Sequence, residues 1–172
     1  MEKTKAEKRV LIAKDVLANL KADKLRVVTG NYCTFKNQDN WNEVCSFKEG
    51  SLKKQLKAMK SKVYCEGCAL GGAFQAYVMR YNNYDTYEGT DYFDFKPMAI
   101  LRKIFTKLQL DMIESAFERH NMTDDIDDGI KECIADSTKF GQNYEFDDER
   151  LVAIMENIVQ NKGTFKPSKK VV

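Results

Sequence analysis

The segment CALGGAFQAYVMRY, residues 68–81, constrains the fold of this chain most strongly, because it is apolar almost all the way round a helix. A helix of that kind is buried at the centre of a protein. Small residues on one flank let a neighbouring backbone approach closely, at some cost in helix propensity for the glycines. These small residues are Ala69, Gly72, Ala73 and Ala76. The sequence therefore predicts a buried central helix.

Apolar residues recur at three- and four-residue spacing in other segments, which predicts about six helices around the central one. We expect them over residues 5–21, 51–59, 97–105, 106–121, 123–141 and 147–161. The core stripe of the first helix is expected to be Val10, Ala13, Val16, Leu17 and Leu20. Thr106 and Gln109 form a capping-box pattern, and Gly141 is a typical residue to end a helix.

A small β element is predicted near the N-terminus. In residues 24–35, KLRVVTGNYCTF, β-branched and aromatic residues stand on both sides of Thr29-Gly30-Asn31. This pattern is typical of a β-hairpin with a glycine-assisted turn. Residues 35–50 follow no clear period, and residues 81–95 indicate a long loop or an irregular hairpin. The expected fold class is therefore mainly α (α+β).

The length and composition favour one domain. The chain has 172 residues, 43% of them hydrophobic, which is enough for one sizeable core. No proline- or serine-rich linker divides it. We expect a single globular domain over residues 1–163 and a flexible basic tail over residues 164–172.

The sequence points to a cytoplasmic protein that does not enter the membrane. Its longest apolar run is too short to cross a bilayer, and the first residues, MEKTKAEKR, are charged instead of forming an apolar signal segment. The five cysteines are an odd number in a chain that does not need disulfides. A reducing cytosol is the expected location.

Charge is distributed unevenly along the chain. Residues 1–62 carry a net charge of +8, residues 63–161 carry −10 and residues 162–172 carry +4, although the whole chain carries only +2. Such asymmetry affects partners and association rates more than the fold. Whether the basic and acidic parts form separate faces or neutralise each other stays open at this stage.

The cysteines allow two hypotheses besides ordinary core packing. Cys65 and Cys68 form a CxxC pair, and Cys33 with Cys45 could complete a zinc site, although the twelve positions between these two are not the usual spacing. A redox role for the CxxC pair would depend on a thiol pKa lowered at a helix N-terminus. Packing of small apolar thiols is the more common arrangement, so we expect no metal and no cofactor.

Catalytic patterns are weak. The single histidine, His120, stands near the end of a charged helix, and GxSxG, GxxxxGK[ST], HExxH and GxGxxG do not occur. The run DDIDDG, residues 124–129, fails the EF-hand template and is more typical of acids at a helix start. We therefore expect a protein that is not an enzyme.

Two sets of residues are predicted to contact a partner. The first is a lysine-rich helix face, which could follow phosphates but more often is simply solvated: Lys53, Lys54, Lys57 and Lys60. The second is the tyrosine-rich segment after residue 81, whose rings offer rigid contact area between acidic residues: Tyr84, Tyr87 and Tyr92.

The segments CALGGAF and ERLVAIMENIVQNKGTF resemble a family of small uncharacterised proteins of tailed bacteriophages and prophages. This resemblance implies a viral accessory protein in the cytoplasm of a bacterial host, with a host protein as partner, but transfers no catalytic residues. The expected function is stoichiometric inhibition or modulation of a host defence or regulatory factor. Two alternatives stay open: a nucleic-acid-binding accessory protein using the N-terminal basic surface, and a protein that binds or sequesters a small nucleotide.

Overall fold

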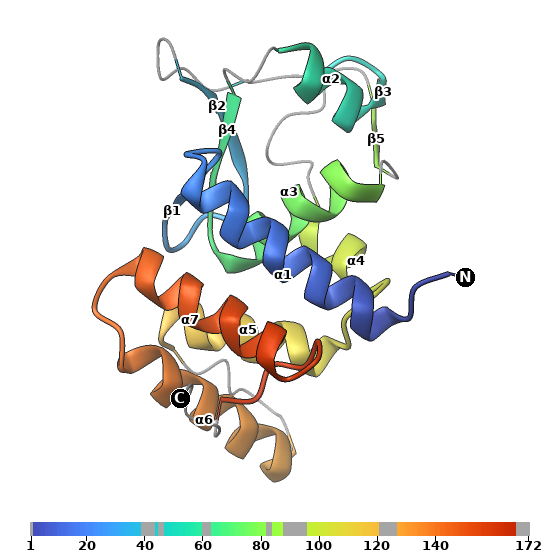
Figure 1. Ribbon diagram of the computed structural model, residues 1–172. Helices are drawn as coiled ribbons and strands as arrows, with labels where there is room; N and C mark the ends of the chain where they lie inside the picture. Colours follow the sequence, from blue (N-terminus) through green and yellow to red (C-terminus); the bar gives the residue numbers. More distant parts are fainter. Residues whose placement is uncertain are drawn as a thin grey trace.

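A computed structural model describes residues 2–38, 44, 47–59, 63–81, 84–87, 96–120 and 127–167. The expected mainly helical α+β class is confirmed (Figure 1). In the described residues there are seven helices: α1 (Lys5–Lys21), α2 (Leu52–Ala58), α3 (Ala69–Tyr81), α4 (Pro97–Leu101), α5 (Lys107–Glu118), α6 (Asp128–Gln142) and α7 (Asp147–Gln160). The central helix is α3, because every residue from Ala69 to Val78 in it is buried.

The three-stranded sheet differs from the predicted hairpin. Strands β1 (Leu25–Val27) and β2 (Thr34–Asn37) form where strands were expected, but β4 (Val63–Gly67) lies between them. β1 is parallel to β4 and β2 is antiparallel to it. Gly30 adopts the left-handed backbone expected for a turn, with a φ of +73°. The hairpin prediction is nevertheless wrong, because the connection spans the width of β4 instead of joining neighbouring strands.

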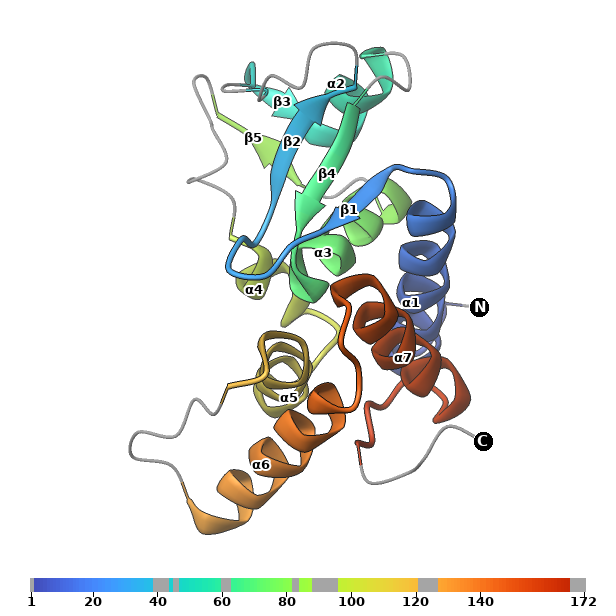
Figure 2. The same cartoon turned by 90° about the vertical axis from the view of Figure 1, so that its left-hand side faces the viewer.

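A second pair of strands joins the start of α2 to the segment that follows α3. β3 (Gly50–Ser51) pairs antiparallel with β5 (Asp85–Thr86). Gln55 strengthens this junction, since its side-chain amide donates to the Lys48 carbonyl and to the Thr86 hydroxyl at 2.8 and 2.9 Å. Figure 2 shows α2, β3 and β5 at one end of the molecule and α5 and α6 at the other.

The core face of α1 is rotated from the predicted stripe. Its buried residues are Ile12, Ala13 and Val16, whereas Val10 is only half-buried. The reason is that α1 packs against α7 as well as α3, so its inward direction falls between these two neighbours. The predicted apolar stripe assumed that α1 packs against one neighbour, and it therefore placed Val10 in the core.

Two residues that were predicted to shape helix ends, Gln109 and Gly141, have other contacts in the structure. Thr106 caps α5, but the Gln109 side chain does not complete a capping box; its amide donates to the Phe165 carbonyl and its oxygen accepts from the Phe165 amide. Gly141 lies inside α6, which continues to Gln142. A Cβ at Gly141 would stand 1.8 Å from the Ala116 carbonyl oxygen, so this glycine permits close contact with α5.

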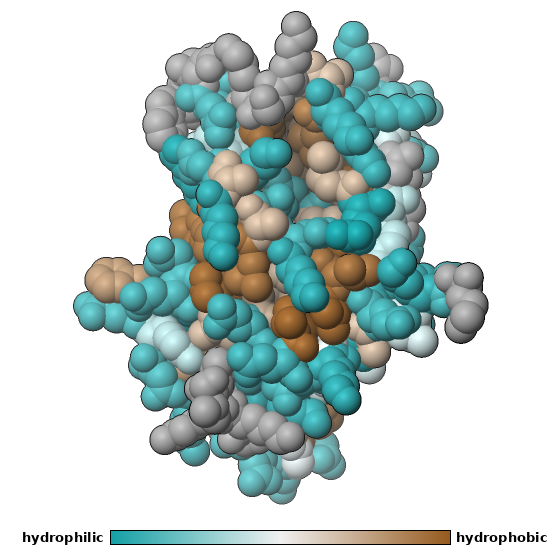
Figure 3. All heavy atoms as spheres, viewed as in Figure 1, coloured by the Kyte–Doolittle hydropathy of each residue, from teal (hydrophilic) through white to brown (hydrophobic). Residues whose placement is uncertain are grey.

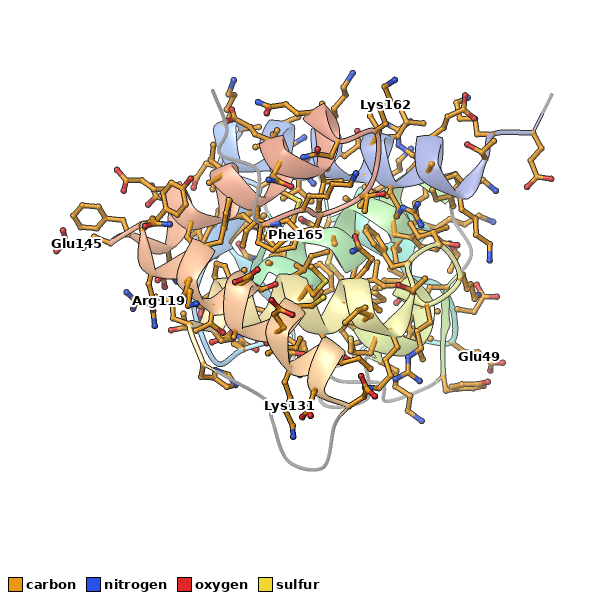
Figure 4. The ribbon with its side chains drawn as sticks, turned by 90° about the horizontal axis from the view of Figure 1, so that it is seen from below. Glu49, Arg119, Lys131, Glu145, Lys162 and Phe165 are labelled. Carbon is orange, nitrogen blue, oxygen red and sulfur yellow. The ribbon has the colours of Figure 1, made fainter. Side chains whose placement is uncertain are left out.

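The predicted tail begins too early. α7 ends at Gln160, and the chain leaves it through two residues with left-handed backbone, Lys162 and Gly163, whose φ angles are +54° and +91°. Phe165 then enters the core with 1% of its surface exposed, and the Lys166 amide donates to the Asn157 side chain at 2.8 Å. Figure 4 shows Phe165 inside the molecule and Lys162 at its edge. A flexible tail starting at residue 164 is thus wrong for residues as far as Lys166.

Candidate binding surfaces

The fold brings the lysine-rich helix and the tyrosine-rich segment together. The Leu52 amide at the start of α2 donates to the Tyr84 carbonyl at 3.1 Å, and Ser51 faces Asp85 across the β3–β5 pair. The Lys53 ammonium also approaches the Arg80 carbonyl at 3.5 Å. Two sets predicted separately therefore lie at one end of the molecule. The other two predicted contact residues, Lys60 and Tyr92, lie outside the described residues.

The two described tyrosines of this segment have different environments. Tyr84 is half-buried, and its ring packs edge-on against Phe74 with ring centres 5.3 Å apart. Tyr87, just after β5, is 80% exposed, the most exposed of the large hydrophobic residues described. Core packing thus explains Tyr84, whereas Tyr87 presents most of its ring to solvent.

The lysines of α2 form a basic face at the same end of the molecule as Tyr87 (Figure 2). Lys54 and Lys57 are exposed and Lys53 is half-buried, and the helix LKKQLKA contains no acidic residue. Within the described part of the chain, the Lys54 and Lys57 ammonium groups form no ion pair. We call the four residues Lys53, Lys54, Lys57 and Tyr87 the α2 surface.

Few ion pairs join the basic and acidic parts of the chain within the described residues. Most ion pairs between described residues join neighbours in sequence, such as Lys107–Asp111 and Lys131–Asp128. Among these residues, a base of the first part meets an acid of the second part only at Lys36–Glu66, at 2.7 Å. The lysines of α2 lie at the opposite end of the molecule from the acids of α6 (Figure 2).

The cysteines are arranged as core residues. Cys33, Cys65 and Cys68 are buried, and the Cys33 and Cys65 sulfurs are 3.3 Å apart. Burial raises the pKa of Cys68 to about 12 and raises that of Cys33 well above its ordinary value. The redox hypothesis required a lowered pKa, and burial has the opposite effect here. Cys45 is not described, and no metal-binding group of three or more His, Cys, Asp or Glu occurs among the described residues.

A polar cluster that the sequence did not predict joins the β1–β2 connection to α5. The Tyr32 hydroxyl donates to Glu114, which is only 9% exposed, and the Gly30 amide donates to both Glu118 oxygens at 3.0 and 3.2 Å. Burial raises the pKa of Glu118. These contacts hold the connection against α5, and their separation of more than eighty positions in sequence leaves no local signal.

A fully buried arginine also has a structural role. The Arg150 guanidinium donates to the Phe117 carbonyl at 2.6 Å and to Asp147 at 3.0 Å, and it also reaches the Tyr144 and Glu145 carbonyls. It joins the end of α5 and the residues before α7 to the first turn of α7. In the acidic run, Asp127 caps α6, whereas residues 124–126 lie outside the described residues. The exposed His120 accepts a hydrogen bond from Thr138 through its backbone.

A shallow apolar groove runs between the N-terminal half of α1 and the end of α7. Figure 3 shows brown apolar side chains gathered where these two helices lie side by side. Ala6, Val10, Leu11 and Val159 line the groove, together with Lys3, Glu7 and Lys162. Sequence periodicity placed Val10 in the core and so did not predict this groove.

Comparisons of the chain with protein-family models, curated proteins and solved structures give no match. In the described parts of the chain, no helix has both the length and the apolar character needed to cross a membrane.

Proposed function

We propose that this protein works by stoichiometric binding, using the α2 surface to hold an acidic region of a partner protein. The observation that carries the proposal is that the β3–β5 pair holds the exposed Tyr87 and the lysines of α2 at the same end of the molecule (Figure 2). Exposed tyrosines often contribute much of the free energy of binding at interfaces, because a rigid ring loses little entropy. Exposed lysines attract an acidic partner and raise its association rate.

The resemblance to phage accessory proteins suggests where to look for the partner. We propose a host defence or regulatory protein in the bacterial cytoplasm, inhibited or modulated by occupation of its own binding site. On this proposal the protein needs no catalytic residues. The structural roles found for Arg150, the cysteines and the Tyr32 cluster support that reading, because each is explained by packing.

Site-specific photocrosslinking tests the proposal. A photoreactive phenylalanine analogue at position 87 is expected to join one discrete host protein in a bacterial lysate. The same analogue at Lys131, an exposed position on α6 at the far end, serves as the control. The double substitution Lys54→Glu and Lys57→Glu should abolish the crosslink, whereas Lys131→Glu with Lys139→Glu should leave it unchanged. An identical set of crosslinks from both positions would reject the α2 surface.

The lack of acids on α2 also favours a second candidate, nucleic-acid binding through the same lysines. In that case nuclease treatment of the lysate would remove the captured material. The affinity for DNA or RNA would fall steeply as salt rises, because each lysine–phosphate contact releases counterions. A crosslinked protein that survives nuclease treatment excludes this alternative as the basis of the capture.

A further inference from the structure

A mixed polar and apolar cavity lies where the end of α1, α2, α3 and the three-stranded sheet meet. Its volume is about 290 Å³, near the lower limit for pockets that take small organic ligands. The apolar part of the wall comes from the sheet, α2 and α3. These residues are Phe35, Leu56, Val63 and Met79. A flat hydrocarbon or heteroaromatic body matches such a lining, since methionine adapts its shape to a ring.

Two amide side chains supply fixed polar atoms to the same cavity. The Gln75 amide nitrogen donates to the Lys24 carbonyl at 3.1 Å, and its oxygen accepts from the Asn19 amide nitrogen at 3.4 Å. These bonds set the direction of the Gln75 amide, which is only 7% exposed. No described residue donates to the Asn19 side-chain oxygen, so this oxygen can accept from a ligand. The cavity therefore has a place for a polar edge of the ligand as well as an apolar wall.

The charged residues among the described lining of the cavity are both lysines. Lys24 lies in the turn between α1 and β1 and Lys57 in α2, and no acidic residue is among these described lining residues. Neither ammonium group forms an ion pair within the part of the chain that the structure describes. A cleft with charge of one sign and apolar walls concentrates ligands of the opposite sign. The ligand that fits this lining carries a negative group.

We propose that this cavity binds a small anion with a flat body, of about the size of a nucleoside monophosphate. The negative group would lie between Lys24 and Lys57, the flat body against Phe35 and Met79, and a polar edge against the amide of Asn19. This inference does not rest on the proposed partner binding. The two sites share one residue, Lys57.

Binding of defined probes to the purified full-length protein tests this inference. Titrations of AMP, 1-naphthyl phosphate, adenosine and inorganic phosphate would be followed by protein chemical shifts and calorimetry. We expect saturable binding of at least one of the two aromatic phosphates, and binding at least about tenfold weaker for adenosine and for inorganic phosphate. A preference for AMP over naphthyl phosphate indicates a nucleotide; equal or tighter binding of naphthyl phosphate indicates another aromatic acid.

Matched variants locate the site. Lys24→Ala and Lys57→Ala should each weaken binding about fivefold, whereas Lys54→Ala on the same helix as Lys57 should not. Val63→Phe should fill the cavity and abolish binding, with thermal unfolding measured to confirm that the variant folds. The inference is overturned if neither aromatic phosphate binds at millimolar concentration, or if inorganic phosphate competes as well as they do. An equal loss of affinity in Lys54→Ala and Lys57→Ala would also overturn it.

Discussion

Individual polar residues in this protein act mainly by joining distant segments. The Tyr32 ring is 43% exposed, but its hydroxyl points to the buried Glu114 carboxylate. Burial, followed by the hydrogen bond to Glu114, raises the pKa of Tyr32 well above its ordinary value, so the phenol remains a donor at any physiological pH. A carboxylate removed from water needs such a donor. The contact thus allows an acid to lie between α5 and the β1–β2 connection.

Replacing the donor tests this role. Tyr32→Phe should lower the free energy of unfolding by about 1–2 kcal/mol, because it leaves Glu114 without its hydrogen bond. Urea unfolding measures the change. The control is the same substitution in a Glu114→Gln background, where no buried charge remains and the loss should be smaller. Equal losses in both backgrounds would mean that the ring packing, and not the hydrogen bond, is what matters.

The buried thiols give a prediction about pH. With a pKa of about 12 instead of 9.0, the thiolate fraction of Cys68 at pH 8 is roughly a thousandfold lower in the folded protein than in the unfolded chain. Alkylation of Cys68 should therefore require unfolding. The same shift implies that stability falls as pH rises above about 9, since the unfolded thiols release their protons first.

Alkylation in a Cys45→Ser background, mapped by peptide mass spectrometry, measures this reactivity. The half-buried Cys133 is the internal comparison and should react first. Labelling of Cys68 in the native protein as fast as that of Cys133 at pH 8 would show that burial does not suppress its thiolate.

At the scale of elements, glycines determine how closely helices approach. α6 contains two glycines in different surroundings. A Cβ at Gly141 would collide with the α5 backbone at Ala116, whereas a Cβ at Gly129 would have only the Asp127 side chain as a neighbour, at 3.3 Å. The contact between α5 and α6 therefore depends on Gly141, and Gly129 is an ordinary helix position.

This difference predicts opposite results for one substitution at two sites. Gly141→Ala should destabilise the protein by at least about 2 kcal/mol, because α5 and α6 must move apart. Gly129→Ala should change stability by less than about 1 kcal/mol, in the stabilising direction if helix propensity dominates. Chemical denaturation of both variants measures the changes. Similar stabilities for the two would contradict the close helix contact.

The elements that could be predicted from sequence are those specified by local patterns. Helices α1, α3, α5 and α7 begin and end within a few residues of their predicted limits, because apolar spacing and caps are local. The pairing of β1 and β2 with β4 could not be predicted, since the two residues that meet in each pair are distant in sequence. The role of Gly141 also could not be predicted, because it depends on contact with α5.

In the candidate surfaces, too, local patterns predicted the residues, whereas contacts between distant segments could not be predicted. The lysines of α2 and Tyr87 were predicted from composition and spacing, but their location at the same end of the molecule depends on the β3–β5 pair. The cavity beside Gln75 has lining residues from four separate segments of the chain, so no single motif indicates it. Tyr84 was predicted to contact a partner, yet its ring packs on Phe74, because aromatic composition does not distinguish core rings from exposed ones.

For the molecule as a whole, the segment after α7 joins several helices to one another. Arg9 in α1 donates to the Gly163 carbonyl and to the Ile104 carbonyl, and so joins α1 to the chain just after α4 and α7. Beyond Gly163 the chain turns inward. Phe165 packs edge-on against Phe140 of α6 with ring centres 5.3 Å apart, and Gln109 of α5 holds its backbone. Residues 164–166 thus connect α5, α6 and α7, and so add to the hydrogen bond from Arg150 of α7 to the Phe117 carbonyl of α5.

Two truncations separate this closing segment from the residues after it. Removal of residues 164–172 should lower the free energy of unfolding by at least about 3–5 kcal/mol, since it empties the site of a buried phenylalanine and removes the partners of Gln109 and Asn157. Phe165→Ala alone should account for most of that loss. Removal of residues 168–172 is the matched control and keeps every contact named here. Thermal unfolding of the three variants measures the effect, and indistinguishable midpoints for the two truncations would show that Phe165 does not stabilise the core.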